Sequence, residues 1–241
     1  MFPLGWSNTG NMNDARASHT ASVLTNGKVL VTGGYGNGDI IAITSSELYD
    51  PSTGTWTNTG SMNDARASHT ASVLTNGKVL VTGGYDNGVY TTSSELYDPS
   101  TGTWTNTGSM NDARVSHTAS VLTNGKVLVT GGYGNGVYTT SSELYDPSTG
   151  TWTNTGNMND ARASHTASVL TNGKVLVTGG YDNPHYTTSS ELYDPSTGTW
   201  TYTSSMNNPR ASHTSAVLTN GKVLVTGGYD YGTYTASGEL Y

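Results

Sequence analysis

The sequence predicts an all-β fold made of five near-identical units with four short strands each, and three observations support this prediction. Tryptophan recurs at intervals of 50, 48, 48 and 48 residues, at Trp6, Trp56, Trp104, Trp152 and Trp200. Residues 50–97 and 98–145 differ at only two positions. The composition is 33% hydrophobic and 11% charged, with 31 glycines and 16 tyrosines, which is typical of short strands joined by tight turns. The period indicates one supersecondary unit copied along the chain.

The first half of a unit contains two predicted strands joined by a hairpin. Residues 68–74 form the expected strand a. Residues 78–82 form the expected strand b, whose continuous apolar run indicates burial on both faces. Between them, Asn76-Gly77 predicts a two-residue type I′ turn, in which both central residues need a positive φ.

The second half of the unit contains the other two predicted strands. The pair Gly83-Gly84 ends strand b, and residues 90–97 form the expected strand c. Residues 98–102, Asp-Pro-Ser-Thr-Gly, predict a turn because Pro fixes φ and Gly leaves it free. Strand d begins at residues 103–105.

Four strands per unit, each unit covered on both faces by identical neighbours, predict the blades of a β-propeller. The chain begins on a strand d, Gly5-Trp6-Ser7, and ends on a strand c at residues 239–241. We therefore expect one propeller domain over residues 1–241, in which the N-terminal strand d closes the fifth blade and leaves no unpaired end. The alternative is that the chain is one segment of a longer or assembled ring.

The repeat resembles the kelch repeat. A Gly-Gly pair follows a Val-Leu-Val strand, Glu-Leu-Tyr-Asp-Pro comes next, and Trp lies seven residues after the Tyr. The motifs Met-x-x-Ala-Arg-x-x-His-Thr-Ala and Asn-Gly-Lys-Val-Leu-Val-Thr-Gly-Gly are similar to the galactose-oxidase-type subgroup. The resemblance covers essentially the whole chain. It specifies the fold far more than the function, because one fold carries many functions.

Alternating strand directions place the d–a and b–c loops at one end of the blades, here called the loop face. The b–c loops are where the copies differ, and the first is two residues longer than the others. Any specificity is therefore expected on the loop face. The alternative is that these loops differ because nothing constrains them.

Two sets of residues on the loop face are candidate ligand contacts. One is the tyrosine after each Gly pair: Tyr35, Tyr85, Tyr133, Tyr181 and Tyr229. The other is the arginine before each strand a: Arg16, Arg66, Arg114, Arg162 and Arg210. The kelch resemblance implies that such residues contact acidic peptides near the central opening, and Arg and Tyr suit this role chemically. The alternative is that aspartates two residues before four of these arginines neutralise them.

Other repeated residues are expected to be structural. The histidine that opens each strand a is expected to make a blade-to-blade hydrogen bond rather than to ligate a metal. The glutamate of each Glu-Leu-Tyr is expected to be buried and to accept hydrogen bonds from backbone amides. The tryptophans are expected to be packing residues.

The composition argues against several classes of function. A net charge of −7 disfavours nucleic acid, and no segment approaches the length of a membrane span. The chain has no cysteine, so the cysteine-linked tyrosine of galactose-oxidase copper chemistry is excluded. Catalysis requires groups in different environments, and five near-equal blades do not supply them. We therefore expect no catalytic residues, no metal and no cofactor.

The leading functional hypothesis is a non-catalytic binding scaffold that holds a peptide, protein or carbohydrate ligand on the loop face. The second is a structural repeat protein, amplified or engineered, without an evolved ligand. A kelch-type sugar-modifying enzyme is the third. Because identical blades allow strands to pair in the wrong blade, we expect a monomer with some tendency to form domain-swapped oligomers.

Overall fold

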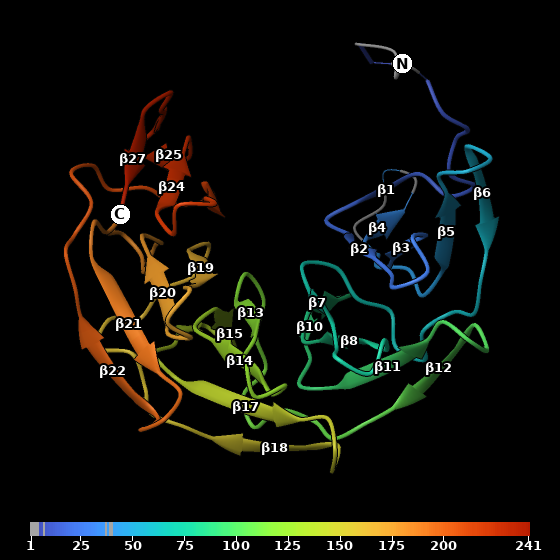
Figure 1. The fold of residues 1–241 in the computed structure, drawn as a ribbon, viewed down its shortest axis with the longest axis horizontal. Coiled ribbons are helices and arrows are strands. Elements are labelled where there is room, and N and C mark those ends of the chain that lie inside the picture. Colours follow the sequence, from blue (N-terminus) through green and yellow to red (C-terminus); the bar gives the residue numbers. More distant parts are fainter. Residues whose placement is uncertain (1–4, 7, 37, 39–40) are drawn as a thin grey trace.

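The computed structural model describes residues 5–6, 8–36, 38 and 41–241. Five β-sheets follow one another along an arc in chain order (Figure 1). The described part of the chain contains no helix, and so none that could cross a membrane. The predicted fold class is confirmed as an all-β, five-bladed β-propeller with antiparallel four-stranded blades.

Four of the five sheets contain all four strands. Blade 1 consists of β2 (Thr20–Val23), β3 (Val29–Thr32), β5 (Ser46–Asp50) and β6 (Thr55–Asn58). Blade 2 consists of β7 (Thr70–Val73), β8 (Val79–Thr82), β11 (Ser94–Asp98) and β12 (Thr103–Asn106). Blade 3 consists of β13 (Thr118–Val121), β14 (Val127–Thr130), β17 (Ser142–Asp146) and β18 (Thr151–Asn154). Blade 4 consists of β19 (Thr166–Val169), β20 (Val175–Thr178), β21 (Ser190–Asp194) and β22 (Thr199–Tyr202).

The fifth sheet and the b–c loops complete the strand inventory. Blade 5 has three strands, β23 (Thr214–Val217), β24 (Val223–Thr226) and β27 (Gly238–Leu240). The b–c loops carry the short strands β4 (Tyr35–Gly36), β9 (Tyr85–Asp86), β10 (Val89–Tyr90), β15 (Tyr133–Gly134), β16 (Val137–Tyr138), β25 (Tyr229–Asp230) and β26 (Thr233–Tyr234). In blade 1, β1 (Arg16–Ala17) pairs with β4.

The second strand of each interior blade is the centre of the core. All four residues of β8, β14 and β20 are buried, which confirms the burial predicted from their apolar run. The core extends from one blade to the next: Leu24 and Leu30 of blade 1 pack with Val79 and Val81 of blade 2. The innermost strands β2, β7, β13, β19 and β23 contact their neighbours in order. Each interior blade is therefore stabilised by the blade on either side of it.

Two local predictions need correction. The a–b turn is not type I′. Gly77 has a φ of +82°, but Asn76 is not among the residues with a positive φ. The Gly77 amide donates to the Leu74 carbonyl at 2.9 Å, which makes a type I turn followed by a left-handed glycine. Predicted strand c is also interrupted between β10 and β11. The Arg66 guanidinium donates to the Ser93 carbonyl at this break, so the break separates the loop hairpin from the blade.

The prediction that the N-terminal strand completes the fifth blade is wrong. Among the described residues β27 pairs only with β24, and the Trp6 side chain is fully exposed. Figure 1 shows an opening between blade 1 and blade 5. Ser7, the last residue of the predicted strand, lies outside the described residues.

Candidate ligand-binding face

The d–a and b–c loops lie together, as the strand directions predict. In blade 2 the Ala67 amide donates to the Tyr85 carbonyl at 3.0 Å, and the Tyr85 amide donates to the Ala67 carbonyl at 2.9 Å. Blades 3, 4 and 5 repeat this bridge with Val115, Ala163 and Ala211. The loop face is therefore a continuous surface on which both candidate residue sets begin.

The five arginines turn away from this surface into the blades, and all five side chains are fully buried. In blade 3, Arg114 Nη1 donates to the Gly131 carbonyl at 2.8 Å, and Nη2 donates to Glu143 Oε1 at 2.8 Å. The guanidinium thus holds the Gly-Gly turn against the third strand. An ion pair without water access needs such hydrogen bonds to offset the cost of burial.

The glutamate partner is fully buried as well. Glu143 Oε2 accepts the Asn111 amide at 2.7 Å, and Oε1 accepts the Asp112 amide at 3.2 Å. This confirms that the repeated glutamates accept backbone amide hydrogen bonds. In the end blades these hydrogen bonds lower the pKa of Glu47 and Glu239, although burial acts in the opposite direction.

The predicted role of the arginines as ligand contacts is therefore corrected to a structural one. Arg16, Arg66, Arg114, Arg162 and Arg210 each bind a glutamate of their own blade. The aspartates also lie near the arginines, as the alternative expected, but they are the more distant partners. Asp112 Oδ2 lies 3.5 Å from Arg114 Nη2, and its side chain is half-exposed. The sequence showed an Arg on the loop face, but could not show which way its side chain turns.

The histidines bridge neighbouring blades, as predicted. Thr70 Oγ1 and His117 Nε2 share a hydrogen bond of 2.9 Å, and the other junctions repeat it with His69, His165 and His213. Burial, and then the nearby arginine, lowers the pKa of His69 to about 3 and that of His213 to about 4. These imidazoles are neutral at pH 7. The described residues contain no group of three or more His, Cys, Asp or Glu that could hold a metal ion.

Tyrosines form a continuous aromatic band across the loop face from blade 2 to blade 5. Within one b–c hairpin, the rings of Tyr133 and Tyr138 are tilted with centroids 4.8 Å apart. Between hairpins, Tyr138 meets Tyr181 edge-on at 5.6 Å. These alternating contacts define the tyrosine band: Tyr85, Tyr90, Tyr133, Tyr138, Tyr181, Tyr186, Tyr229, Tyr231 and Tyr234.

Five of the nine tyrosines of the band were not predicted from the sequence. The predicted tyrosines Tyr85, Tyr133, Tyr181 and Tyr229 each face a second tyrosine across the hairpin, such as Tyr90 opposite Tyr85. The signal was a second tyrosine five residues after the first. Blade 1 lacks it: Tyr35 faces Ala42 there, and residues 37, 39 and 40 of its longer loop lie outside the described residues.

Three phenols of the band, those of Tyr90, Tyr138 and Tyr186, have raised pKa values. Partial burial, and then Tyr181 and Tyr133, raises the pKa of Tyr138, and similar causes raise the pKa values of Tyr90 and Tyr186. Each ring is only partly covered, so part of its aromatic surface remains available to a ligand, although the Tyr181 hydroxyl already donates to Asn183 Oδ1 at 2.9 Å. Such rings combine apolar contact area with a polar tip.

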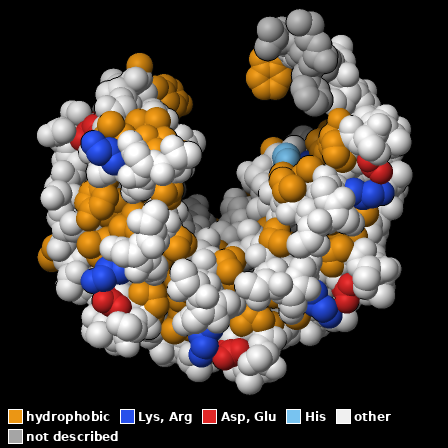
Figure 2. Space-filling model, viewed as in Figure 1, with side chains coloured by type: hydrophobic (Ala, Val, Ile, Leu, Met, Phe, Trp, Pro, Cys, Tyr) orange, Lys and Arg blue, Asp and Glu red, His pale blue; other side chains and the backbone are white. Residues whose placement is uncertain are grey.

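Pockets repeat between the d–a and b–c loops of the loop face, each with an aspartate from a d–a loop. A pocket of about 300 Å³ contains Asp112 and Val137, one of about 370 Å³ contains Asp160 and Tyr186, and one of about 400 Å³ lies beside Asp14. The basic side chains are elsewhere: the arginines are buried, and four lysines pair with aspartates at 3.0–3.1 Å beside the a–b turns. Blue and red side chains lie side by side along the arc in Figure 2. The described pockets on the loop face therefore each contain an aspartate and no lysine or arginine.

The arc of blades with its repeated Arg–Glu pairs defines a kelch-type β-propeller. The Attractin/LZTR1 beta-propeller family matches residues 4–183, and the Kelch motif matches residues 162–207. The chain belongs to the Attractin/LZTR1 beta-propeller family. The solved structure described as "Structure of YjhT" is similar with a TM-score of 0.77 and 19% identity, over 93% of this chain and 81% of that chain. At this identity the likeness concerns the fold. A comparison with curated proteins finds no match.

Proposed function

We propose that this propeller is a non-catalytic binding scaffold whose loop face holds a peptide, protein or glycan. The tyrosine band is the observation that supports this proposal. Its rings span four blades without interruption, and the variable b–c loops carry them. Kelch propellers are commonly protein-interaction scaffolds, which agrees with this assignment.

The charge of the face indicates which ligands fit. With the arginines buried, the accessible charges beside the band include Asp64, Asp112 and Asp160. An acidic peptide would meet like charges without compensation, whereas a neutral or basic ligand would not. The proposal is therefore a neutral glycan or a neutral-to-basic peptide segment, with stacking on tyrosine and hydrogen bonds to the aspartates.

A screen of neutral glycans, basic peptides and acidic peptides tests the proposal. We expect binding in the first two sets, and a loss of at least about tenfold in affinity for Tyr138→Ala, since a buried aromatic contact contributes on the order of 1–3 kcal/mol. The matched variant is Tyr138→Phe, which keeps the aromatic ring and removes only the hydroxyl, so it is expected to retain most of the affinity. Binding that is unaffected by Tyr138→Ala, or selective for acidic peptides, would contradict the proposal.

The second candidate is a structural repeat protein without a ligand, and the near-identity of residues 50–97 and 98–145 favours it. A complete absence of binding in the screen, with both tyrosine variants folded, would support that candidate instead.

A further inference from the structure

The tyrosine band has a regular spacing from blade to blade. In blade 3 the ring centroids of Tyr133 and Tyr138 are 4.8 Å apart, and Tyr138 lies 5.6 Å from Tyr181 of blade 4. Blade 2 repeats these two steps at 5.1 and 5.6 Å. Equivalent rings of neighbouring blades therefore lie within about 11 Å of each other, and one turn of a polyproline II helix covers about 9 Å, with three residues at ~3.1 Å each. Every third residue of such a helix can thus meet an equivalent ring.

The hydroxyl groups of the band supply hydrogen-bond donors. Among the described residues, the hydroxyls of Tyr90 and Tyr138 have no hydrogen-bond partner, whereas that of Tyr181 donates to Asn183 Oδ1 at 2.9 Å. A polyproline II helix makes no internal hydrogen bonds, so its carbonyl groups are free acceptors. Proline has no backbone N–H that would need an acceptor on the protein. A proline-rich segment therefore needs what the band offers, which is ring surface and donors.

The aspartates of the loop face lie apart from most of the rings. The pockets that contain Asp14 and Asp112 include no tyrosine of the band, and the pocket with Asp160 includes one, Tyr186. A sugar that stacks on a ring needs partners for its hydroxyls around that same ring. A Lys or Arg side chain instead carries its charge at the end of a long apolar stem. The separation favours a peptide, with apolar rings on the band and a basic side chain in a pocket.

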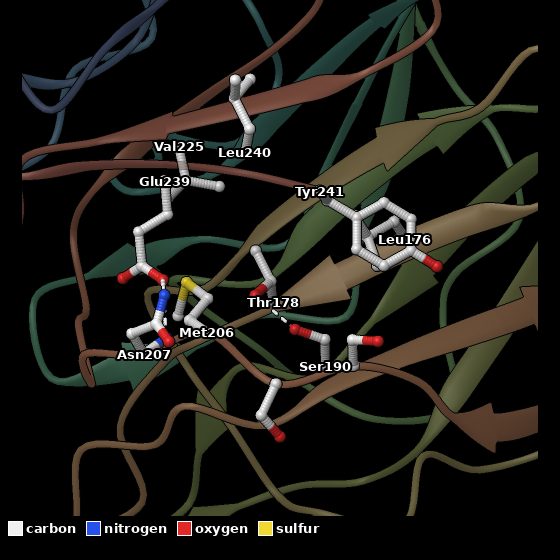
Figure 3. Close-up of a pocket in the computed structure, with 11 residues that line it drawn as sticks. Leu176, Thr178, Ser190, Met206, Asn207, Val225, Glu239, Leu240 and Tyr241 are labelled. Carbon is white, nitrogen blue, oxygen red and sulfur yellow. Dashed lines mark hydrogen bonds between the residues drawn. The ribbon is translucent and has the colours of Figure 1, made fainter.

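A further pocket, of about 340 Å³, lies between blades 4 and 5 and is not part of this surface (Figure 3). Its lining includes Thr178, Met206 and Glu239 and no tyrosine of the band. The Asn207 side chain in its wall donates to Glu239 Oε2 at 2.9 Å, so this carboxylate is already engaged.

We infer that the tyrosine band binds a proline-rich segment of a partner protein in the polyproline II conformation, with a Lys or Arg of that segment at an aspartate of the loop face. This inference rests on the proposed function and narrows its ligand to one class of peptide. Prolines three residues apart lie on equivalent rings of neighbouring blades, such as Tyr90 and Tyr138. Because the helix is already extended before it binds, little conformational entropy is lost on binding.

The first test measures the binding of labelled oligoprolines by fluorescence anisotropy. Peptides of three, six and nine prolines, each ending in arginine, form one, two and three turns of the helix. We expect the affinity to rise at least about tenfold from three to nine prolines, since the longer peptides reach a second and a third blade. Nine prolines that bind no more tightly than three would overturn the inference.

Substitution of one ring tests the place of binding. Tyr138→Ala is expected to weaken the binding of the nine-proline peptide at least about tenfold, as for the loss of a central interface aromatic. Tyr138→Phe keeps the ring and loses only the hydroxyl, so the expected loss is at most about tenfold and smaller than that of Tyr138→Ala. Circular dichroism and urea unfolding check that both variants are folded. Unchanged affinity in a folded Tyr138→Ala chain would contradict the inference.

The charge of the peptide tests the role of the aspartates. Nine-proline peptides that end in Arg, Ala or Glu are expected to bind in that order of affinity, with roughly a threefold step from Ala to Arg, the size of an exposed ion pair. Added salt is expected to reduce the differences. A peptide ending in Glu that binds as tightly as the one ending in Arg would overturn the placement of a basic side chain at an aspartate.

Neutral glycans and proline-free basic peptides, measured with the same protein, separate this inference from the proposed function. If either set binds and the nine-proline peptide does not, the inference is wrong while the proposed function stands. If none of the three binds, both are wrong. Binding of the nine-proline peptide that is tighter than that of the other two sets supports both.

Discussion

Blades 3 and 5 have nearly the same strands but very different surroundings. Tyr145 of blade 3 is 0% exposed, whereas its repeat Tyr241 is 40% exposed. Thr130 is buried and Thr226 is exposed. Blade 3 has a neighbour on both faces, while blade 5 has one neighbour and lacks its outer strand. Burial in this protein is therefore a property of the junction between two blades, as in other repeat proteins whose stability is a sum of units and interfaces.

The largest difference between the blades is expected at the buried ion pair. Glu143→Leu removes the buried partner of Arg114 and leaves only the more distant, half-exposed Asp112 as a counter-charge, which costs about 4 kcal/mol of unfolding free energy. Glu239→Leu in blade 5 is expected to cost clearly less, because Glu239 is partly exposed and water reaches the pair. Urea unfolding of both variants measures the two costs. Equal costs would show that the end blade shields its pair as well as an interior blade does.

The next difference concerns apolar packing. Leu128→Ala in blade 3 removes a side chain that is 1% exposed and is expected to cost about 3 kcal/mol, from lost burial and from the cavity left behind. Leu224→Ala, the same position in blade 5, is expected to cost about 1 kcal/mol since the open face already gives it contact with water. Thermal and urea unfolding measure the loss of unfolding free energy in each variant, and so the ratio of the two losses.

The smallest difference is in the pH dependence of stability. Burial holds the pKa of His117 well below 6.5, and less strongly lowers that of His19 at the open end. The unfolded chain therefore binds protons first as the pH falls. The stabilising contribution is complete above pH 6.5 and is lost as the pH falls toward the folded pKa.

His117→Gln is therefore expected to reduce the loss of stability between pH 6.5 and 5 by on the order of 1–2 kcal/mol, and His19→Gln by less. Urea unfolding at a series of pH values measures both. A steeper loss in His117→Gln than in the wild-type chain would mean that the folded protein holds a charged imidazole there.

The sequence determined the repeat, the strand order within a blade and the residues that join blades. The spacing of Trp and Gly-Gly gave the units, and the run Val79–Thr82 gave a strand buried on both faces. Glu143 and His117 were correctly expected to bind backbone amides and a neighbouring blade. These features are local or repeat in every copy, so the pattern alone carries them.

Only the tertiary structure decided where the arginines point and whether the ring closes. Arg114 could face a ligand or Glu143 with the same sequence, and the buried carboxylate together with two backbone carbonyls decides in favour of the interior. Closure depends on an angle repeated over four junctions, and no single residue encodes it.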